Sequence, residues 1–65
     1  MISYSPLKHY MIDNNIDRNY MINEVGISAT TFTKLNKNDY VRLDILEKIC
    51  LHFDLPIEKV LEVKK

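Results

Sequence analysis

Apolar residues recur along most of this chain at spacings of three and four, which is the period of an amphipathic helix. The longest such pattern forms an apolar stripe of Leu43, Leu46, Ile49, Cys50 and Phe53. Leu51 falls outside the stripe and is expected on the surface. A second pattern near the N-terminus places on one face Leu7, Tyr10, Met11 and Asn14. The periodicity therefore predicts an all-α fold.

Residues that favour helix ends divide the chain into five predicted helices. Pro6 follows Ser5, and proline suits the first turn of a helix because its missing N–H costs nothing there. Ser5, Asp17 and Ser28 are expected N-caps, since short polar side chains accept a hydrogen bond from the first helical turn. The predicted helices span about residues 6–14, 18–25, 29–36, 43–53 and 56–61.

Gly26 is the only glycine, and it directly follows the second predicted helix. A helix end commonly requires positive φ, which glycine adopts without steric cost. Asn14 and Asn15 tolerate the same conformation and are expected to end the first helix. The side chains expected to point inward from the other helices are Met21, Val25, Phe32, Leu35, Ile57, Val60 and Leu61.

The remaining segments are short. Residues 1–4 and 62–65 are candidates for terminal strands, and Tyr40–Val41 is a candidate extended piece. No Asn-Gly or Asp-Gly hairpin signal occurs, and there is no internal repeat or linker. The expected architecture is a compact five-helix domain over residues 1–65, with short terminal strands.

Composition limits the classes of function. With 65 residues, the chain has room for one small core and none for a large cofactor cleft. A single cysteine excludes an internal disulfide and a multi-cysteine zinc site. The absence of a long apolar run predicts no transmembrane helix or signal peptide, so a cytoplasmic location is expected.

Charge points to one segment of the chain. Nine basic residues balance nine acidic residues, so no general attraction to nucleic acid is expected. Residues 25–38, however, contain Lys34 and Lys37 and no acidic residue. This segment is therefore the place where a basic surface is expected.

Residues 17–38 have the layout of a helix, a tight turn and a second helix, which is typical of a helix-turn-helix. The first helix and the glycine turn would fix the crossing angle, and the second would present its N-terminal side chains to a DNA major groove. Small residues at its front permit close approach, and threonine can contact bases or phosphates. Lys34 and Lys37 lie further along and suit phosphates, as do Ser28 and the helix N-terminus.

The sequence resembles the Cro/repressor-type, or XRE-type, helix-turn-helix family of bacterial and phage transcription regulators. The resemblance covers about residues 5–62. It is carried by Pro6-Leu7, Asn15-Ile16, Met21, Val25-Gly26-Ile27-Ser28, Thr31-Phe32-Thr33-Lys34-Leu35, Leu46-Glu47-Lys48-Ile49-Cys50 and Asp54-Leu55-Pro56-Ile57.

This resemblance implies sequence-specific binding of double-stranded DNA and transcription regulation, with repression as the family expectation. The recognition helix would be residues 29–36. By position, Arg18 would clamp a phosphate, while Ala29, Thr30 and Thr33 would face base edges. Lys34, Asn36 and Asn38 would lie near the DNA backbone. A homodimer would suit two half-sites, with contacts through the fourth and fifth helices or the terminal strands.

No constellation of residues indicates an enzyme, a cofactor, a metal ion or a small-molecule substrate. Cys50 lies on an apolar stripe and is expected to be a buried hydrophobe. His9 and His52 have no second ligand nearby in the sequence. An alternative of another class remains open, namely a protein–protein interaction module of the same fold. Zero net charge and Ala29 favour that alternative, and the acid-free segment favours DNA.

The tyrosines divide into two expected groups. Tyr10, Tyr20 and Tyr40 are expected in or near the core. Tyr4, like Leu51, has no obvious core position and is expected to contribute to a partner surface.

Overall fold

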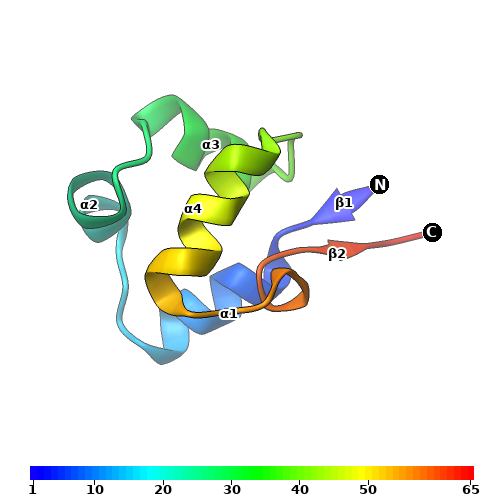
Figure 1. Ribbon diagram of the computed structural model, residues 1–65. Helices are drawn as coiled ribbons and strands as arrows, with labels where there is room; N and C mark the ends of the chain where they lie inside the picture. The colour runs from blue at the N-terminus through cyan, green and yellow to red at the C-terminus, as the bar shows by residue number, and fades with distance from the viewer.

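The computed structural model describes residues 1–65 and consists of helices around one core, closed by a small sheet at the chain ends (Figure 1). The N-terminal half contains β1 (Ile2–Ser3), α1 (Ser5–Asp13), α2 (Arg18–Tyr20) and the π-helical η1 (Met21–Val25). The C-terminal half contains α3 (Ala29–Lys37), α4 (Leu43–Phe53), the 3-10 turn η2 (Ile57–Lys59) and β2 (Glu62–Val63). The mostly helical fold predicted from periodicity is confirmed.

Two of the three predicted N-caps are confirmed. The Asp17 carboxylate accepts a hydrogen bond from the N–H of Tyr20 at 2.8 Å, and the Ser28 hydroxyl accepts one from the N–H of Thr31 at 3.0 Å. Ser5 is instead the first residue of α1, with Tyr4 at the N-cap. The N-cap has no side-chain hydrogen bond, but the hydroxyl of Ser3 in the preceding strand accepts the N–H of Ser5 at 3.2 Å.

The predicted helix over 18–25 has the expected extent, but its second half is wider than an α-helix. The N–H groups of Gly26 and Ile27 both donate to the carbonyl oxygen of Met21, at 3.1 and 3.3 Å. Gly26 makes this closure possible because its φ is +88°, the positive value predicted for it. α2 and η1 thus form one continuous helix that ends at the glycine.

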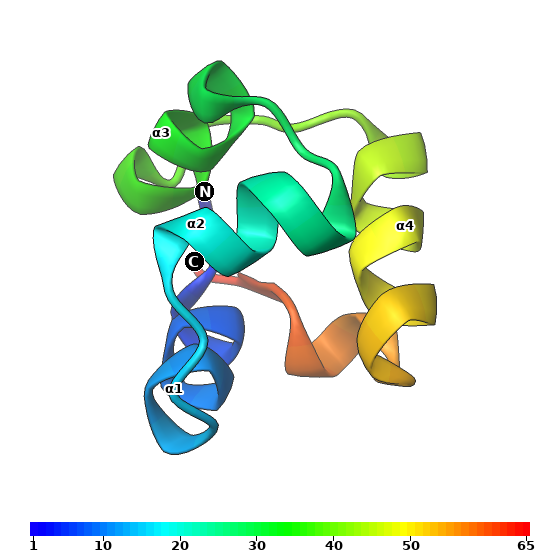
Figure 2. The same ribbon diagram turned by 90° about the vertical axis from the view of Figure 1, so that its left-hand side faces the viewer.

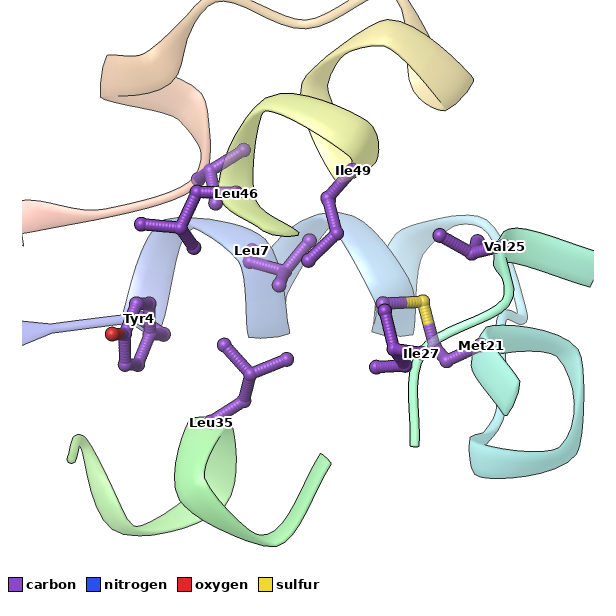
Figure 3. Packing of buried hydrophobic residues seen from close by; sticks show 9 residues of the cluster. Tyr4, Leu7, Met21, Val25, Ile27, Leu35, Leu46 and Ile49 are labelled. Carbon is purple, nitrogen blue, oxygen red and sulfur yellow. The ribbon is translucent and has the colours of Figure 1, made fainter. Parts of the chain in front are cut away.

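Nine buried hydrophobic side chains from most of these elements form the core (Figure 3). They are Tyr4, Leu7, Met21, Val25, Ile27, Leu35, Leu46, Ile49 and Val60. Phe32, Cys50 and Phe53 pack against this cluster from its edge. The expectation that Tyr4 lies on a partner surface is wrong, because its side chain is fully buried and its hydroxyl donates to the carbonyl of Asp39 at 2.8 Å.

Several apolar residues near element ends are more exposed than predicted. Leu43 is 77% exposed because it is the first residue of α4 and projects beyond the core. Tyr40 is exposed in the connection between α3 and α4, and Ile57 is exposed at the start of η2. Leu51 is exposed, as predicted.

The chain ends form the predicted strands, and β1 pairs antiparallel with β2 in the register Ile2 with Val63 and Ser3 with Glu62. The predicted fifth helix is reduced to the single turn of η2, because the chain after Lys59 turns away to join β1. Tyr40–Val41 belongs to neither strand. The two termini therefore lie side by side, on the side of the molecule away from α2 (Figure 1).

Candidate nucleic-acid interface

The turn between η1 and α3 sets the position of α3, which lies above the α2–η1 helix in Figure 2. Gly26 ends η1, Ile27 is buried in the core, and Ser28 starts α3. Leu35 is the buried side chain of α3, and Phe32 packs at the core edge. The exposed residues of α3 are Ala29, Thr30, Thr33, Lys34, Asn36 and Lys37.

The exposed face of α3 holds the residues predicted for DNA contact. Its side chains recur at spacings that place them on one continuous strip of the helix: Ala29, Thr30, Thr33, Lys34 and Lys37, all exposed. The small side chains occupy the N-terminal half, and the two lysines occupy the C-terminal half. A partner thus meets close-fitting groups at one end of the strip and positive charge at the other.

Hydrogen bonds within the chain already involve three of the hydroxyl groups in the first half of α3 and at its N-cap. The hydroxyl of Thr33 donates to the carbonyl of Ala29 at 3.0 Å, which fixes its rotamer and leaves the oxygen lone pairs as acceptors. The hydroxyl of Ser28 accepts the N–H of Thr31 and donates to the Thr31 hydroxyl. The hydroxyl of Thr30 has no partner within the chain, so both its donor and its acceptor capacity are free.

The cations predicted for phosphate contact are not neutralised by carboxylates. The ion pairs of the structure join Arg42 to Asp44 and Lys64 to Glu62. Lys34, Lys37 and Arg18, all exposed, take part in neither. Arg18 is the first residue of α2 and forms no ion pair with Asp13 or Asp17.

Asn38, another predicted contact, serves the fold with part of its side chain. It ends α3 with φ +59°, and its amide oxygen accepts the N–H of Tyr4 at 3.0 Å. The amide N–H₂ group therefore remains as the only part of the side chain available to a phosphate.

Lys8 joins this region without having been predicted for it. Its ammonium group donates to the carbonyl oxygen of Asn36 at 3.1 Å and lies 3.5 Å from the amide oxygen of Asn38. A lysine at a helix C-terminus stabilises the carbonyls that have no partner there. Lys8 is 28 residues away from Asn36, so no local pattern of the sequence could have identified the contact.

Lys48 of α4 has the same relation to the α2–η1 helix. Its ammonium group donates to the carbonyl oxygen of Gly26 at 3.3 Å, at the end of η1. Both helices of the predicted helix-turn-helix therefore carry a lysine from another element on a C-terminal carbonyl.

The remaining side chains that could bind a metal ion or act as a nucleophile form no common site. No group of three or more His, Cys, Asp or Glu side chains could hold a metal ion. Cys50 is half-buried rather than fully buried, and burial raises the pKa of its thiol. His52 shares a hydrogen bond of 2.8 Å with the hydroxyl of Tyr20, and His9 lines a surface groove beside α1. None of the helices has the length and apolar character needed to cross a membrane.

Comparison with known proteins agrees with this geometry. Residues 6–65 match the family model of the Cro/C1-type HTH DNA-binding domain. The fold is similar to the crystal structure of the transcriptional regulator VanUg, with a TM-score of 0.87 and 33% sequence identity. That similarity covers 94% of this chain and 81% of the other. No functionally curated protein matches the chain.

Proposed function

Because this chain belongs to the Cro/C1-type helix-turn-helix DNA-binding domain family, a family of transcription regulators, we propose that it reads duplex DNA with α3 and acts as a repressor. In this proposal α3 lies in the major groove, and the bound protein blocks access of the polymerase to the promoter. The observation that carries the proposal is the exposed strip of α3, which combines small side chains with two unpaired lysines.

The front of α3 is assigned to base recognition. A B-DNA major groove is about 12 Å wide and admits one helix, so the residues nearest the floor must be small. Ala29 and Thr30 meet that requirement, and each offers a methyl group for contact with thymine. Thr30 also offers a free hydroxyl, whereas Thr33 offers only acceptor lone pairs in the observed rotamer.

Phosphate contacts are assigned to both ends of the strip. Lys34, Lys37 and Arg18 would neutralise phosphates, because their charges have no partner within the chain. The backbone N–H groups of Ser28 and of the first residues of α3 would donate to a further phosphate, and the amide N–H₂ of Asn38 would contact the DNA backbone at the far end. These contacts orient the helix but carry no sequence information.

Zero net charge shapes the affinity expected from this surface. Long-range attraction to DNA depends on overall charge, so binding here depends on the local cations. Each neutralised phosphate contributes about −0.9 to the slope of log affinity against log salt, so three cations predict a slope of about −3 per protomer. A single small domain of this kind binds weakly, and we propose that two copies bind two half-sites as a homodimer.

The test is to measure binding to random duplex DNA by fluorescence anisotropy at a series of salt concentrations. The proposal predicts micromolar affinity at low salt that falls steeply as salt is raised. Absence of binding at the lowest salt would overturn it, and would favour the alternative that the domain serves protein–protein interaction.

A further inference from the structure

Four aromatic side chains from three helices meet at the surface beside α2. Tyr20 of α2 stacks on Phe53 of α4, with ring centroids 6.0 Å apart and an interplanar angle of 27°. His52 of α4 packs edge-on against both rings, at 5.6 Å from Tyr20 and 4.8 Å from Phe53. Tyr10 of α1 meets the Phe53 ring edge-on at 5.3 Å. Phe53 also packs against the core, so the cluster connects α2 to the interior.

One hydrogen bond lies within this cluster. It joins the Tyr20 hydroxyl to Nε2 of His52 at 2.8 Å, between residues 32 positions apart in the sequence. Tyr20 is the last residue of α2, and His52 lies in the last turn of α4. Because a hydrogen bond is directional, whereas ring packing permits sliding, this bond fixes where α2 sits on α4.

The first turn of the α2–η1 helix has little other support. None of the three residues of α2 is buried, and Met21 is the first residue of this helix to enter the core. The Asp17 carboxylate accepts the N–H of Tyr20 at 2.8 Å, which closes the cap but does not attach the turn to another element. Tyr20 therefore joins the turn to its own cap through the backbone and to α4 through the side chain.

This turn also presents Arg18. Arg18 is the first residue of α2, is exposed and takes part in no ion pair. Residues two apart lie about 200° apart around a helix axis, so Arg18 leaves the turn on the side opposite the Tyr20 contact with α4. A loose turn would spread the guanidinium group over many positions, and the entropy lost on ordering it would oppose a phosphate contact.

We propose that His52 is a positioning residue for DNA binding. Through Tyr20 it holds the first turn of α2, and so Arg18, in the place from which Arg18 neutralises a phosphate. This inference rests on the proposed function and adds to it a residue that does not touch DNA itself. The C-terminal end of α4, which carries His52, lies on the side of the molecule away from α3 (Figure 2).

Binding of single variants to random duplex DNA at low salt tests the proposal. Tyr20→Phe keeps the ring and should weaken binding by about threefold to tenfold, the factor that one hydrogen bond contributes. It should also reduce the salt slope toward that of Arg18→Ala. His52→Phe should give the same loss, which excludes a direct contact of the Tyr20 hydroxyl with DNA as the cause. Tyr10→Phe is the matched control and should keep the parent affinity, because the Tyr10 hydroxyl makes no hydrogen bond within the chain.

A double-mutant cycle with Arg18 separates positioning from a general loosening of the fold. In the Arg18→Ala background, Tyr20→Phe should cause no further loss of affinity, because the contact that the hydrogen bond positions is already absent. A loss of the same size in both backgrounds would overturn the proposal, as would parent affinity in both Tyr20→Phe and His52→Phe. Absence of binding by the parent chain is a different failure, because it overturns the proposed function and the role of His52 with it.

Backbone NMR relaxation of the free protein gives a readout that needs no DNA. The order parameters of Arg18 and Asn19 should fall in Tyr20→Phe and keep the parent values in Tyr10→Phe. Residues of α3 should keep theirs in both variants, which shows that the rest of the domain is folded. Unchanged order parameters at Arg18 and Asn19 would contradict the claim that the Tyr20–His52 bond holds this turn.

Discussion

The ammonium group of Lys48 lies 3.3 Å from the carbonyl oxygen of Gly26, so α4 holds the end of η1 at the turn that leads into α3. Lys8 binds the carbonyl of Asn36 at the end of α3 in the same way. These two contacts tie both helices of the helix-turn-helix to the rest of the fold from the side opposite their N-terminal caps. The exposed strip of α3 is thereby presented on a fixed support.

Replacement of Gly26 by alanine should lower the free energy of unfolding by about 1–2 kcal/mol, because its φ of +88° is unfavourable for residues with a Cβ. The added Cβ would also lie 3.1 Å from the Lys48 ammonium, so the flexible lysine must move away from the carbonyl. Urea denaturation measures the loss. Gly26→Asn is the matched control and should lose less, since asparagine tolerates this conformation. Equal stability of Gly26→Ala and the parent chain would contradict the argument.

Stability should fall at alkaline pH because of Tyr4. Burial raises the pKa of the Tyr4 phenol above its ordinary value of 10.0; a backbone hydrogen bond from Val41 lowers it, and the charge of Asp39 raises it. The unfolded chain therefore loses this proton at lower pH than the folded chain, and the stabilisation disappears as pH rises through the folded pKa. Tyr4→Phe should show a smaller alkaline loss in the free energy of unfolding. Tyr40→Phe, at an exposed position, should retain most of the parent pH dependence, because the charge of Tyr40 is the smallest of the causes that raise the Tyr4 pKa. Identical profiles for the two variants would refute this role of burial.

Much of the fold could be predicted because the relevant signals are local. The caps Asp17 and Ser28, the positive φ of Gly26 and the stripe of α4 each depend on a few neighbouring residues. The predictions that were wrong concern residues whose environment depends on contacts between distant segments. Tyr4 is buried because the chain ends pair, and η2 is short because β2 must reach β1.

In the candidate site, too, the features that depend on local spacing could be predicted and those that depend on distant contacts could not. The strip on α3 follows from helical spacing alone, and its exposure agrees with the prediction. Lys8 and Lys48 could not be identified, since each reaches a carbonyl more than twenty residues away in the sequence. The internal use of the Asn38 amide oxygen has the same origin, because its partner is Tyr4.

Lys34→Ala should weaken binding to every duplex and reduce the salt slope by about one, because one phosphate contact is lost. Anisotropy titrations at several salt concentrations measure both quantities. Lys59→Ala is the control, since it removes the same charge from η2, an element apart from α3. If the two variants behave alike, the effect reflects net charge, and α3 has no special place in binding.

Thr30→Val should relax the preference for one base pair and leave affinity for random duplex unchanged. Valine keeps the shape and the methyl group of threonine but removes the hydroxyl, which has no partner within the chain. Selection of preferred sites from a random duplex library, done for the parent chain and the variant, shows the difference. Lys37→Ala provides the contrast, because loss of a phosphate contact should lower affinity for preferred and random sites equally. If Thr30→Val keeps the site preference of the parent chain, the Thr30 hydroxyl takes no part in base recognition.

The most direct measurement is an NMR titration of the labelled protein with a short duplex, which reports every backbone amide separately. We expect the largest shift changes at Arg18 and over residues 28–37, with little change in the groove formed by Pro6, His9 and Lys59. That result would identify α3 as the DNA-binding face. Changes centred on the groove, or no changes at low salt, would contradict the central claim that this domain binds DNA through α3.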